Sequence, residues 1–373
     1  MPEASGIVTY QRLKELVRQG GVVSNLPIED SQYQPASLDV RLGRIAYRIR
    51  SSFVPGNRAV EDVLQDLRMY TLDLETNGIL EKNQVYLVPL MESLDLPAHI
   101  RVRSNPKSTT GRLDMLTRVI SDANYRFDEI QAGYSGNLYL EIVPNSFTVR
   151  VKPGISLNQL RFIQGNCLIA DQELRALYAQ EPLLYDAENR SIPLERACVQ
   201  QGLLMSVDLQ GEKNRGIIGY KAKKNSDIVD LARVGYYDAA DFWEPIYRQK
   251  KDQLILEPEE FHLLCSQEKV RIPPDYAAEM VAYDIGAGEF RVHYAGFFDP
   301  GFGYGTAGEI PGTHAVLEVR SHEVPYRVSH GQPFCKIQYA ANIEPPQILY
   351  GAGIKSNYQE QTLSLSKQFK PPL

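Results

Sequence analysis

A short loop rich in hydroxyl and basic side chains is followed, later in the chain, by a single carboxylate within an apolar segment. The loop reads Lys107-Ser108-Thr109-Thr110-Gly111-Arg112, and the carboxylate is Glu141 of Leu138-Tyr139-Leu140-Glu141. Lysine, hydroxyl groups and a glycine backbone suit the oxygens of a polyphosphate. A carboxylate on an apolar strand is partly desolvated, which favours its use as a base toward water. The pattern therefore predicts a loop that holds a polyphosphate and an acid that activates water.

The elements that must position these residues are predicted to be short strands. Residues 37–42, 84–89, 138–143 and 147–151 are β-branched or aromatic runs bounded by glycine, proline or asparagine. The 27 glycines and 23 prolines supply the turns that many short strands need. Helical periodicity is confined to short stretches such as 9–18 and 171–180. The sequence thus predicts a mainly β fold with a few short helices.

An internal repeat divides the chain. Ser37-Leu-Asp39 recurs as Ser206-Val-Asp208, and Leu140-Glu141 recurs as Leu317-Glu318, in the same order and at similar separations. We therefore expect two tandem copies of a distorted β-barrel or sandwich domain, because two copies are too few for a solenoid. The first copy, residues 1–165, carries the predicted catalytic motif. Residues 166–199 are expected to form a helical linker, and residues 200–373 a degenerate second copy with a C-terminal tail.

The first copy resembles the dCTP deaminases of the trimeric dUTPase superfamily. Their signature is roughly R/K-S-S-x-x-R followed by G-x-x-x-L-E, and Lys107 to Arg112 and Gly136 to Glu141 match its order and spacing. Residues 36–43 and 91–97 are similar to an early strand and a turn of the family. Its nucleotide-covering tail is resembled by Tyr350 and residues 358–361, followed by Ser366-Lys367. The resemblance implies a dUTPase-like β fold, homo-oligomers with sites between subunits, and deamination of dCTP to dUTP without zinc.

The same resemblance implies roles for individual residues. Glu141 would be the general base for attack of water on cytosine C4, with Ser108 and Arg112 near the reacting centre. Lys107, Thr109, Thr110 and Gly111 would meet the phosphates, and Asp128 the sugar or base edge. Further substrate contacts are expected from the catalytic strand and the tail: Tyr139, Leu140, Lys355, Tyr358 and Gln361. Magnesium would arrive with the triphosphate, so no protein metal cage is expected.

The second copy and the tail depart from the family pattern. Glu318 is kept, but Arg112 corresponds to Gly288 or Glu289, so we expect no complete site in the second copy. In the tail, Asn357 stands where the family has lysine, and the nearest lysine is Lys355.

Composition and missing motifs exclude several function classes. A net charge of −6 and a pI near 5.7 argue against a nucleic-acid-coating protein. The four cysteines are scattered, and we see neither a secretory signal nor an apolar run long enough for a membrane span, so a cytoplasmic location is expected. The H-x-E and P-C-x-x-C motifs of zinc deaminases are missing. Gly303 to Gly308 matches G-x-G-x-x-G without the flanking strand and helix of a dinucleotide site, so we expect a turn there.

Two alternatives remain open. The first is a dUTP pyrophosphatase, or a bifunctional enzyme that also hydrolyses dUTP. The tail at 359–367 lacks the glycines usual in a pyrophosphatase lid, which disfavours a pure pyrophosphatase. The second alternative is a nucleotide-binding regulator without catalytic activity.

Overall fold

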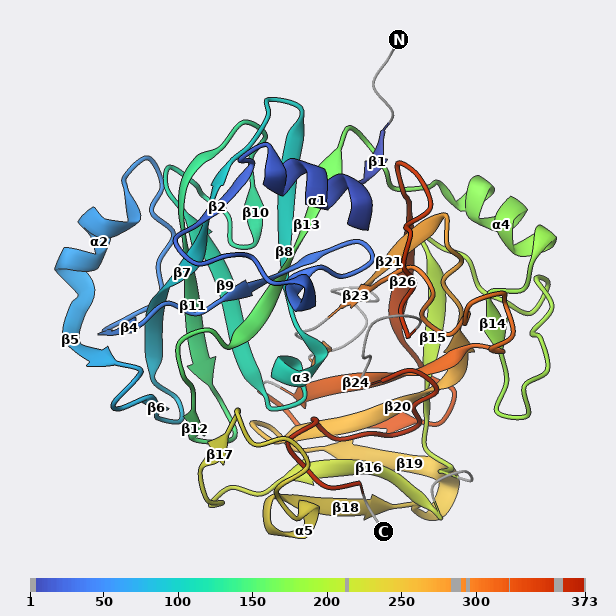
Figure 1. Cartoon of the computed structure of the whole chain (residues 1–373). Helices are drawn as coiled ribbons and strands as arrows, with labels where there is room; N and C mark the ends of the chain where they lie inside the picture. Colours follow the sequence, from blue (N-terminus) through green and yellow to red (C-terminus); the bar gives the residue numbers. More distant parts are fainter. Residues whose placement is uncertain are drawn as a thin grey trace. The chain divides into compact units, whose positions relative to one another are not determined.

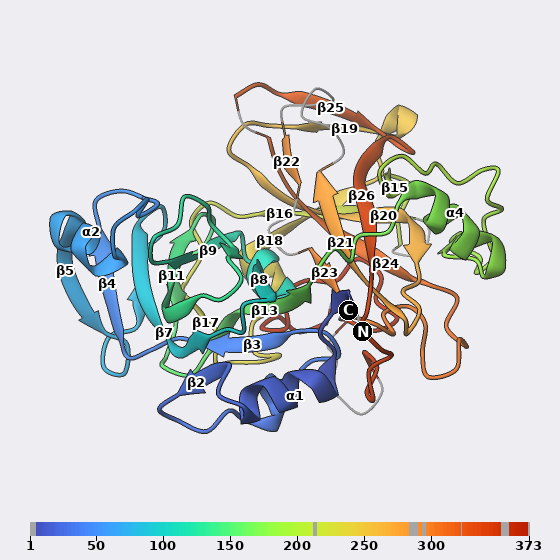
Figure 2. The same cartoon turned by 90° about the horizontal axis from the view of Figure 1, so that it is seen from above.

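The computed structural model describes residues 5–211, 215–282, 290–292, 296–321, 323–351 and 358–371, and these form two compact units (Figures 1 and 2). Unit 1 comprises Met1–Cys167, Lys224–Tyr237 and Ser366–Lys370. Unit 2 comprises Leu168–Lys223, Asp238–Leu365 and Pro371–Leu373. Two short segments from the second half of the chain therefore belong to unit 1.

Unit 1 is built from three sheets. The five-stranded sheet has the order β1 (Gly6–Ile7), β13 (Ser156–Gln164), β8 (Ile100–Pro106), β10 (Glu129–Ile130), with β3 (Leu38–Arg41) also paired to β13. The six-stranded sheet has the order β5 (Arg68–Asp73), β4 (Ile45–Ile49), β7 (Val85–Asp95), β11 (Ser135–Pro144), β9 (Met115–Ser121), with β2 (Val22–Ser24) also paired to β7. The three-stranded sheet joins β17 (Val229–Asp230), β12 (Val149–Arg150) and β6 (Ile79–Leu80).

Short helices cover the sheets of unit 1. α1 (Tyr10–Arg18) buries Leu13 and Leu16, as its periodicity predicts, and the chain turns at Gly20, whose φ is +86°. α2 (Val60–Leu67) begins where the Asp122 carboxylate accepts the Val60 N–H at 2.7 Å. Its apolar face joins a cluster with strand side chains of the six-stranded sheet. The other helical turns are α3 (Ser108–Gly111) and a 3-10 turn (Asp30–Gln32).

Unit 2 contains a ten-stranded sheet and a two-stranded ribbon. The main order is β18 (Trp243–Tyr247), β16 (Ile217–Ala222), β20 (Phe261–Val270), β15 (Leu203–Asp208), β26 (Pro333–Ala341), β21 (Tyr276–Ala282), β23 (Phe297–Phe298). β14 (Leu184–Tyr185) and β24 (Thr313–Ser321) pair with β20, and β22 (Phe290–Val292) pairs with β24. The ribbon is β19 (Gln253–Leu256) with β25 (Tyr326–Ser329), and the helical segments are α4 (Asp171–Gln180), α5 (Ala239–Phe242) and a 3-10 turn (Lys250–Asp252).

Equivalent strand pairs in the two units confirm the internal duplication. In unit 1, Glu141 of β11 pairs with Leu87 of β7. In unit 2, Glu318 of β24 pairs with Leu263 of β20, at the positions that the repeat predicts. The β8–β13 and β21–β26 ladders correspond in the same way. The predicted mainly β architecture with two tandem domains is therefore confirmed.

The segment expected to be a linker belongs to unit 2. α4 buries Leu174, Leu177 and Tyr178 in the main core of that unit. A short amphipathic helix is stable only when its apolar face is covered, and unit 2 supplies that cover. The expected boundaries at 165 and 200 therefore differ from the observed division.

A buried ion pair joins β3 to β7 in unit 1. The Arg41 Nε donates to Glu92 Oε1 at 2.7 Å, and the Arg41 backbone N–H donates to Glu92 Oε2 at 2.7 Å. Gln32 Nε2 also donates to Glu92 Oε1, at 3.0 Å. The Glu92 side chain is 0% exposed, so these donors replace the water that it has lost.

We predict that Glu92→Gln lowers the free energy of unfolding by about 3 kcal/mol, because it leaves the Arg41 charge buried without its counter-ion. Arg44→Gln is the matched control. It breaks the Arg44–Asp73 pair, whose arginine is 66% exposed, and should cost less than about 1 kcal/mol. Urea titration of both variants measures the difference; equal costs would show that the buried pair does not stabilise β3 against β7.

Candidate active site

Glu141 lies at the centre of the six-stranded sheet, on β11 between β7 and β9. Its side chain is 0% exposed. Arg118, directly opposite on β9, donates to Glu141 Oε1 from Nε at 2.9 Å and from Nη2 at 2.5 Å. The other oxygen, Oε2, is buried and has no hydrogen-bond partner among the described residues. One oxygen of the carboxylate is thus held by a cation while the other can accept a proton.

Arg118 is itself fixed by groups from other elements. Its Nη2 donates to Ser52 Oγ at 2.8 Å, and its guanidinium carbon lies 3.9 Å from the centre of the Phe127 ring. Arg118, which the sequence analysis did not name, is thus the guanidinium that binds Glu141 within one chain. The signal that could have identified Arg118 is strand register, because antiparallel pairing of β9 with β11 places it opposite Glu141.

The loop with the hydroxyl groups forms a single helical turn, α3, packed beside β9 and β13. The Lys107 ammonium is bonded to the Asp39 carboxylate. Thr110 is 1% exposed, and its hydroxyl donates to the Leu157 carbonyl at 2.7 Å. Arg112 follows the turn and is 3% exposed, and Ser108 is half-buried. Glu141 accepts none of its hydrogen bonds from Ser108 or Arg112 of the same chain.

A cavity of about 560 Å³ in unit 1 opens beside this loop. Lys107, Thr109 and Thr110 line one part of it, and Lys367 of the C-terminal segment lines another. Burial and the neighbouring Lys107 charge lower the pKa of Lys367, while Asp39 opposes that change. Burial raises the pKa of Asp39, and Lys107 opposes it. Of the two tail lysines noted in the sequence, Lys355 lies outside the described residues, and Lys367 lines the same cavity as the loop.

Asp128 adopts a left-handed backbone conformation, with φ of 60°, at the turn before β10. Its Oδ1 accepts the Val119 N–H at 2.8 Å. Burial of the carboxyl raises its pKa to about 7, although the Val119 N–H and the hydroxyl of Ser104 act in the opposite direction. A carboxyl that titrates near neutrality can either donate or accept a hydrogen bond, which suits the predicted contact with a sugar or base.

The remaining predicted contacts are distributed over both units. Tyr139 is 3% exposed and its hydroxyl donates to Glu61 Oε1 at 3.1 Å, and Leu140 is buried on the same strand. Tyr358 and Gln361 belong to unit 2, where Gln361 Nε2 donates to the His314 carbonyl at 3.0 Å. Gln361 is therefore bound within its own unit, and Tyr358 is buried.

The second copy keeps its acid in the corresponding strand, at Glu318 of β24. This residue is also buried, with 3% of its surface exposed. The loop predicted to lack the arginine, at 283–289, lies outside the described residues. The glycine-rich stretch at 303–308 is a turn, as expected: the Glu309 carboxylate accepts the Thr306 and Ala307 N–H groups at 2.9 and 2.7 Å. These donors hold the pKa of Glu309 at about 2.

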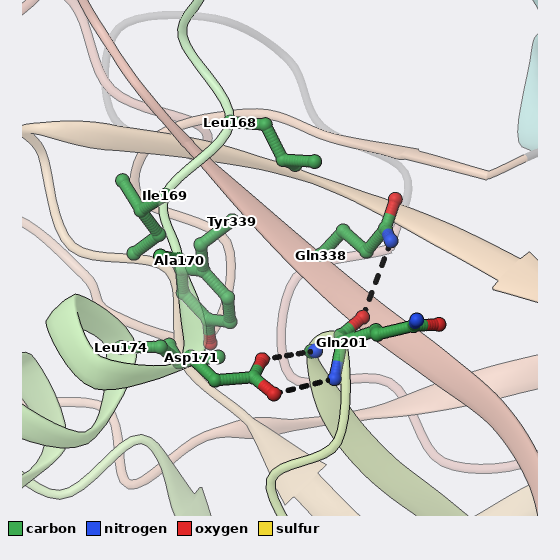
Figure 3. Close-up of a pocket in the computed structure, with 9 residues that line it drawn as sticks. Leu168, Ile169, Ala170, Asp171, Leu174, Gln201, Gln338 and Tyr339 are labelled. Carbon is green, nitrogen blue, oxygen red and sulfur yellow. Dashed lines mark hydrogen bonds between the residues drawn. The ribbon is translucent and has the colours of Figure 1, made fainter.

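A second cavity, of about 440 Å³, lies in unit 2 (Figure 3). Leu168, Ile169 and Leu174 form much of its wall. Its carboxylate, Asp171, accepts the backbone N–H groups of Gln201 and Gly202 at 2.8 and 3.1 Å (Figure 3). Since that acid is already bound to the backbone, we assign no chemistry to this cavity.

Neither a metal cluster nor a membrane helix is found in the described part of the chain. No group of three or more histidine, cysteine, aspartate or glutamate side chains is placed there to hold a metal ion. No helix there is long and apolar enough to cross a membrane.

Comparisons with known proteins cover both units. The family model described as 2'-deoxycytidine 5'-triphosphate deaminase N-terminal domain matches residues 4–166, and the model of the corresponding C-terminal domain matches residues 170–369. A crystal structure of 2'-deoxycytidine 5'-triphosphate deaminase from Agrobacterium tumefaciens is 43% identical, covers 92% of this chain and 100% of its own, and superposes with a TM-score of 0.85.

Two curated relatives carry the description "dCTP deaminase, dUMP-forming". The relative from Beutenbergia cavernae is 31% identical over 150 residues, which are 39% of this chain and 72% of the relative. The relative from Sulfurihydrogenibium sp. is 26% identical over 161 residues, which are 42% of this chain and 82% of the relative.

The raised pKa of Asp128 predicts a pH dependence of stability. Between the ordinary carboxyl pKa of about 4 and the folded value of about 7, the folded protein binds more protons than the unfolded chain. The contribution of Asp128 is therefore fully present below about pH 4 and is lost as the pH rises through 7. Asp128→Asn keeps an oxygen that can accept the Val119 N–H but has no titrating proton. We therefore expect the fall of Tm between about pH 4 and pH 7 to be smaller in this variant.

Thermal unfolding from acid to neutral pH measures this slope. Glu129→Gln, which removes only an exposed partner of Arg126, is the control and should leave the slope unchanged. An Asp128→Asn slope equal to that of the unaltered protein would contradict the assignment.

Proposed function

The chain belongs to the 2'-deoxycytidine 5'-triphosphate deaminase family, and we propose that it catalyses the hydrolytic deamination of dCTP to dUTP and ammonia. The observation that carries the mechanism is the state of Glu141. A fully buried carboxylate with one oxygen bound to Arg118 and the other unpartnered is prepared to take a proton from water. The likeness to the Agrobacterium tumefaciens deaminase over nearly the whole chain supports the same assignment.

In the proposed reaction, Glu141 Oε2 takes a proton from water as the water oxygen bonds to C4 of the cytosine ring. Glu141 then gives this proton to the exocyclic amine, and the C4–N bond breaks so that ammonia leaves. The remaining hydroxyl proton on C4 passes to N3, which forms the C4 carbonyl and the N3–H of uracil. Arg118 fixes Oε1, so the proton acceptor keeps one orientation throughout. The reaction needs neither an oxidant nor zinc chemistry.

We propose that Ser108 and Arg112 act on the cytosine held by Glu141 of another subunit. Within one chain they supply no hydrogen bond to Glu141, although the family signature requires all three residues. A homo-oligomer with sites between subunits reconciles the two observations. The hydroxyl would hold the water or the amine, and the guanidinium would stabilise developing negative charge.

The triphosphate is assigned to Lys107, Thr109 and the Gly111 backbone, with Asp128 on the sugar or base. Thr110 contributes to the fold of the loop, since its hydroxyl is bound to Leu157. Magnesium would enter with the triphosphate and keep several waters, so that only the nucleotide holds it firmly.

A second candidate function is a bifunctional reaction that ends in dUMP. The descriptions of the relatives from Beutenbergia cavernae and Sulfurihydrogenibium sp. favour it, although those matches span 39% and 42% of this chain. The tail at 359–367, which lacks glycine, disfavours only a pure dUTP pyrophosphatase. A regulator without catalysis is the third possibility.

The deciding experiment gives dCTP and magnesium to protein that has been stripped of zinc by a chelator. We expect dUTP and ammonia without pyrophosphate. Formation of dUMP and pyrophosphate would replace the proposal by the bifunctional reaction. Tight nucleotide binding without turnover of dCTP or dUTP would replace it by the regulator.

We predict that Glu141→Gln lowers kcat about a thousandfold, because the amide cannot take a proton from water. The Kd for dCTP should change little, since the amide keeps the shape of the side chain. Steady-state kinetics and calorimetric titration provide the two measurements. Unchanged kcat would remove Glu141 from the role of base.

Arg118→Ala is predicted to lower kcat by about a hundredfold with little change in KM, because the carboxylate loses its fixed orientation. Added guanidinium ion at non-denaturing concentrations should restore part of kcat, which a purely structural defect would not show. Arg126→Ala is the matched control, because that guanidinium is 72% exposed and pairs with Glu129 at the surface. Loss of kcat without any guanidinium rescue would contradict the positioning role.

A further inference from the structure

Residues 52–60 form a strap that connects β4 to α2 and supplies a second acceptor to Arg118. The Ser52 hydroxyl accepts a hydrogen bond from Arg118 Nη2 at 2.8 Å. The same nitrogen donates to Glu141 Oε1, and a terminal guanidinium nitrogen carries two hydrogens, one for each acceptor. Ser52 therefore fixes the guanidinium on a side that the carboxylate does not reach.

The strap is fastened to the connection between β9 and β10, residues 122–128. Three hydrogen bonds join them: Gly56 N–H to the Asn124 carbonyl (3.0 Å), Ala123 N–H to the Arg58 carbonyl (3.1 Å), and Val60 N–H to Asp122 Oδ1 (2.7 Å). Gly56 has a φ of +67°, and a Cβ there would lie 3.3 Å from the Tyr125 ring, so glycine permits the close approach. The strap and this connection thus form one bonded layer.

One apolar cluster supports both groups that hold Arg118. Phe53, next to Ser52 in the chain, and Phe127, whose ring centre lies 3.9 Å from the guanidinium carbon, both pack against it. The cluster consists of buried side chains from β4, α2, β7, β9 and β11: Ile49, Val60, Leu64, Leu87, Ile120 and Tyr139. Because closely packed side chains have few alternative positions, the cluster limits the movement of the hydroxyl and of the ring.

α2 covers the face of the six-stranded sheet that carries Glu141. Tyr139 is two residues before Glu141 on β11, so both side chains point to the same face. The Tyr139 hydroxyl donates to Glu61 in the first turn of α2 at 3.1 Å. The tyrosine is 3% exposed, so little water is present to replace this bond. Tyr139 thus fastens α2 to the strand that bears the acid.

From these contacts we propose that Ser52 is a positioning residue of the deamination, and that the strap and α2 keep its hydroxyl on Arg118. The inference rests on the proposed function, in which Arg118 orients the base. The alternative is a purely structural strap that only packs α2 against the sheet. Ser52 is exposed, so its hydroxyl contributes little to stability, and an effect on kcat can be separated from loss of fold.

Ser52→Ala should lower kcat about tenfold with little change in KM, which is the loss expected for one hydrogen bond. Ser52→Thr keeps the hydroxyl and should hold kcat within about twofold of the unaltered value. Ser51→Ala is the matched control, because Ser51 is also exposed and accepts none of the hydrogen bonds of Arg118. Equal kcat values for Ser52→Ala and the unaltered protein would overturn the proposal, as would a loss that Ser52→Thr does not restore.

Asp122→Ala tests the part played by the strap, because it removes the acceptor of the Val60 N–H at the start of α2. We expect this variant to lower kcat on its own and to add little to the loss in Ser52→Ala, since both changes act through the same segment. Full multiplication of the two losses in the double variant would show that the strap does not hold Ser52 in place.

An NMR measurement separates this inference from the proposed function. The Arg118 Nε–H signal is assigned by its absence from Arg118→Ala, and its exchange with water should be about tenfold faster in Ser52→Ala. Deamination with unchanged kcat and unchanged exchange in that variant would sink the positioning role and leave the function standing. Faster exchange in a protein that does not deaminate dCTP would sink the function and leave the hold of Ser52 on Arg118 standing.

Discussion

A carboxylate that is buried in an apolar sheet loses its hydrogen bonds to water and must be stabilised by other donors. In this protein, Arg118 supplies the donors for Glu141. The guanidinium sits opposite the acid in the strand ladder, rests on the face of Phe127 and is tied to Ser52. Without it, the strand would hold an uncompensated charge at its centre, which costs several kcal/mol. The arrangement also leaves one carboxylate oxygen unsatisfied, which is poor for stability and useful for proton transfer. In the proposed function, the pair that stabilises the sheet is also the pair that serves the chemistry.

The two units share a strand plan but differ in their polar contacts. In unit 1, Glu92 binds the Arg41 side chain, whereas its counterpart in unit 2, Glu268, binds the hydroxyl and backbone N–H of Ser206. In both units, the glutamate at this position of the repeat therefore has hydrogen-bond donors. The duplicated backbone has been retained while the partners of the buried acids have changed.

The sequence was sufficient to predict the features that depend on local pattern. Short strands, the repeat and the loop at Lys107 to Arg112 follow from residue types and spacing over a few positions, and so did the placement of Glu141 within an apolar strand. Arg118 was not singled out, because its role depends on the pairing of β9 with β11, which residue types along the chain do not reveal. Residues 166–199 were expected to form a linker, whereas from Leu168 onward they belong to unit 2. The apolar face of α4 indicates burial but does not identify the surface that buries it.

The composition of unit 1 has a consequence for the history of the chain. β17 and the segment Ser366–Lys370 come from the second half of the sequence, yet they complete sheets and a cavity of the first unit. No single cut separates the chain into two intact domains. A gene that once encoded one domain twice can therefore no longer lose its second half without removing segments of the first unit, so unit 1 has come to depend on the fusion.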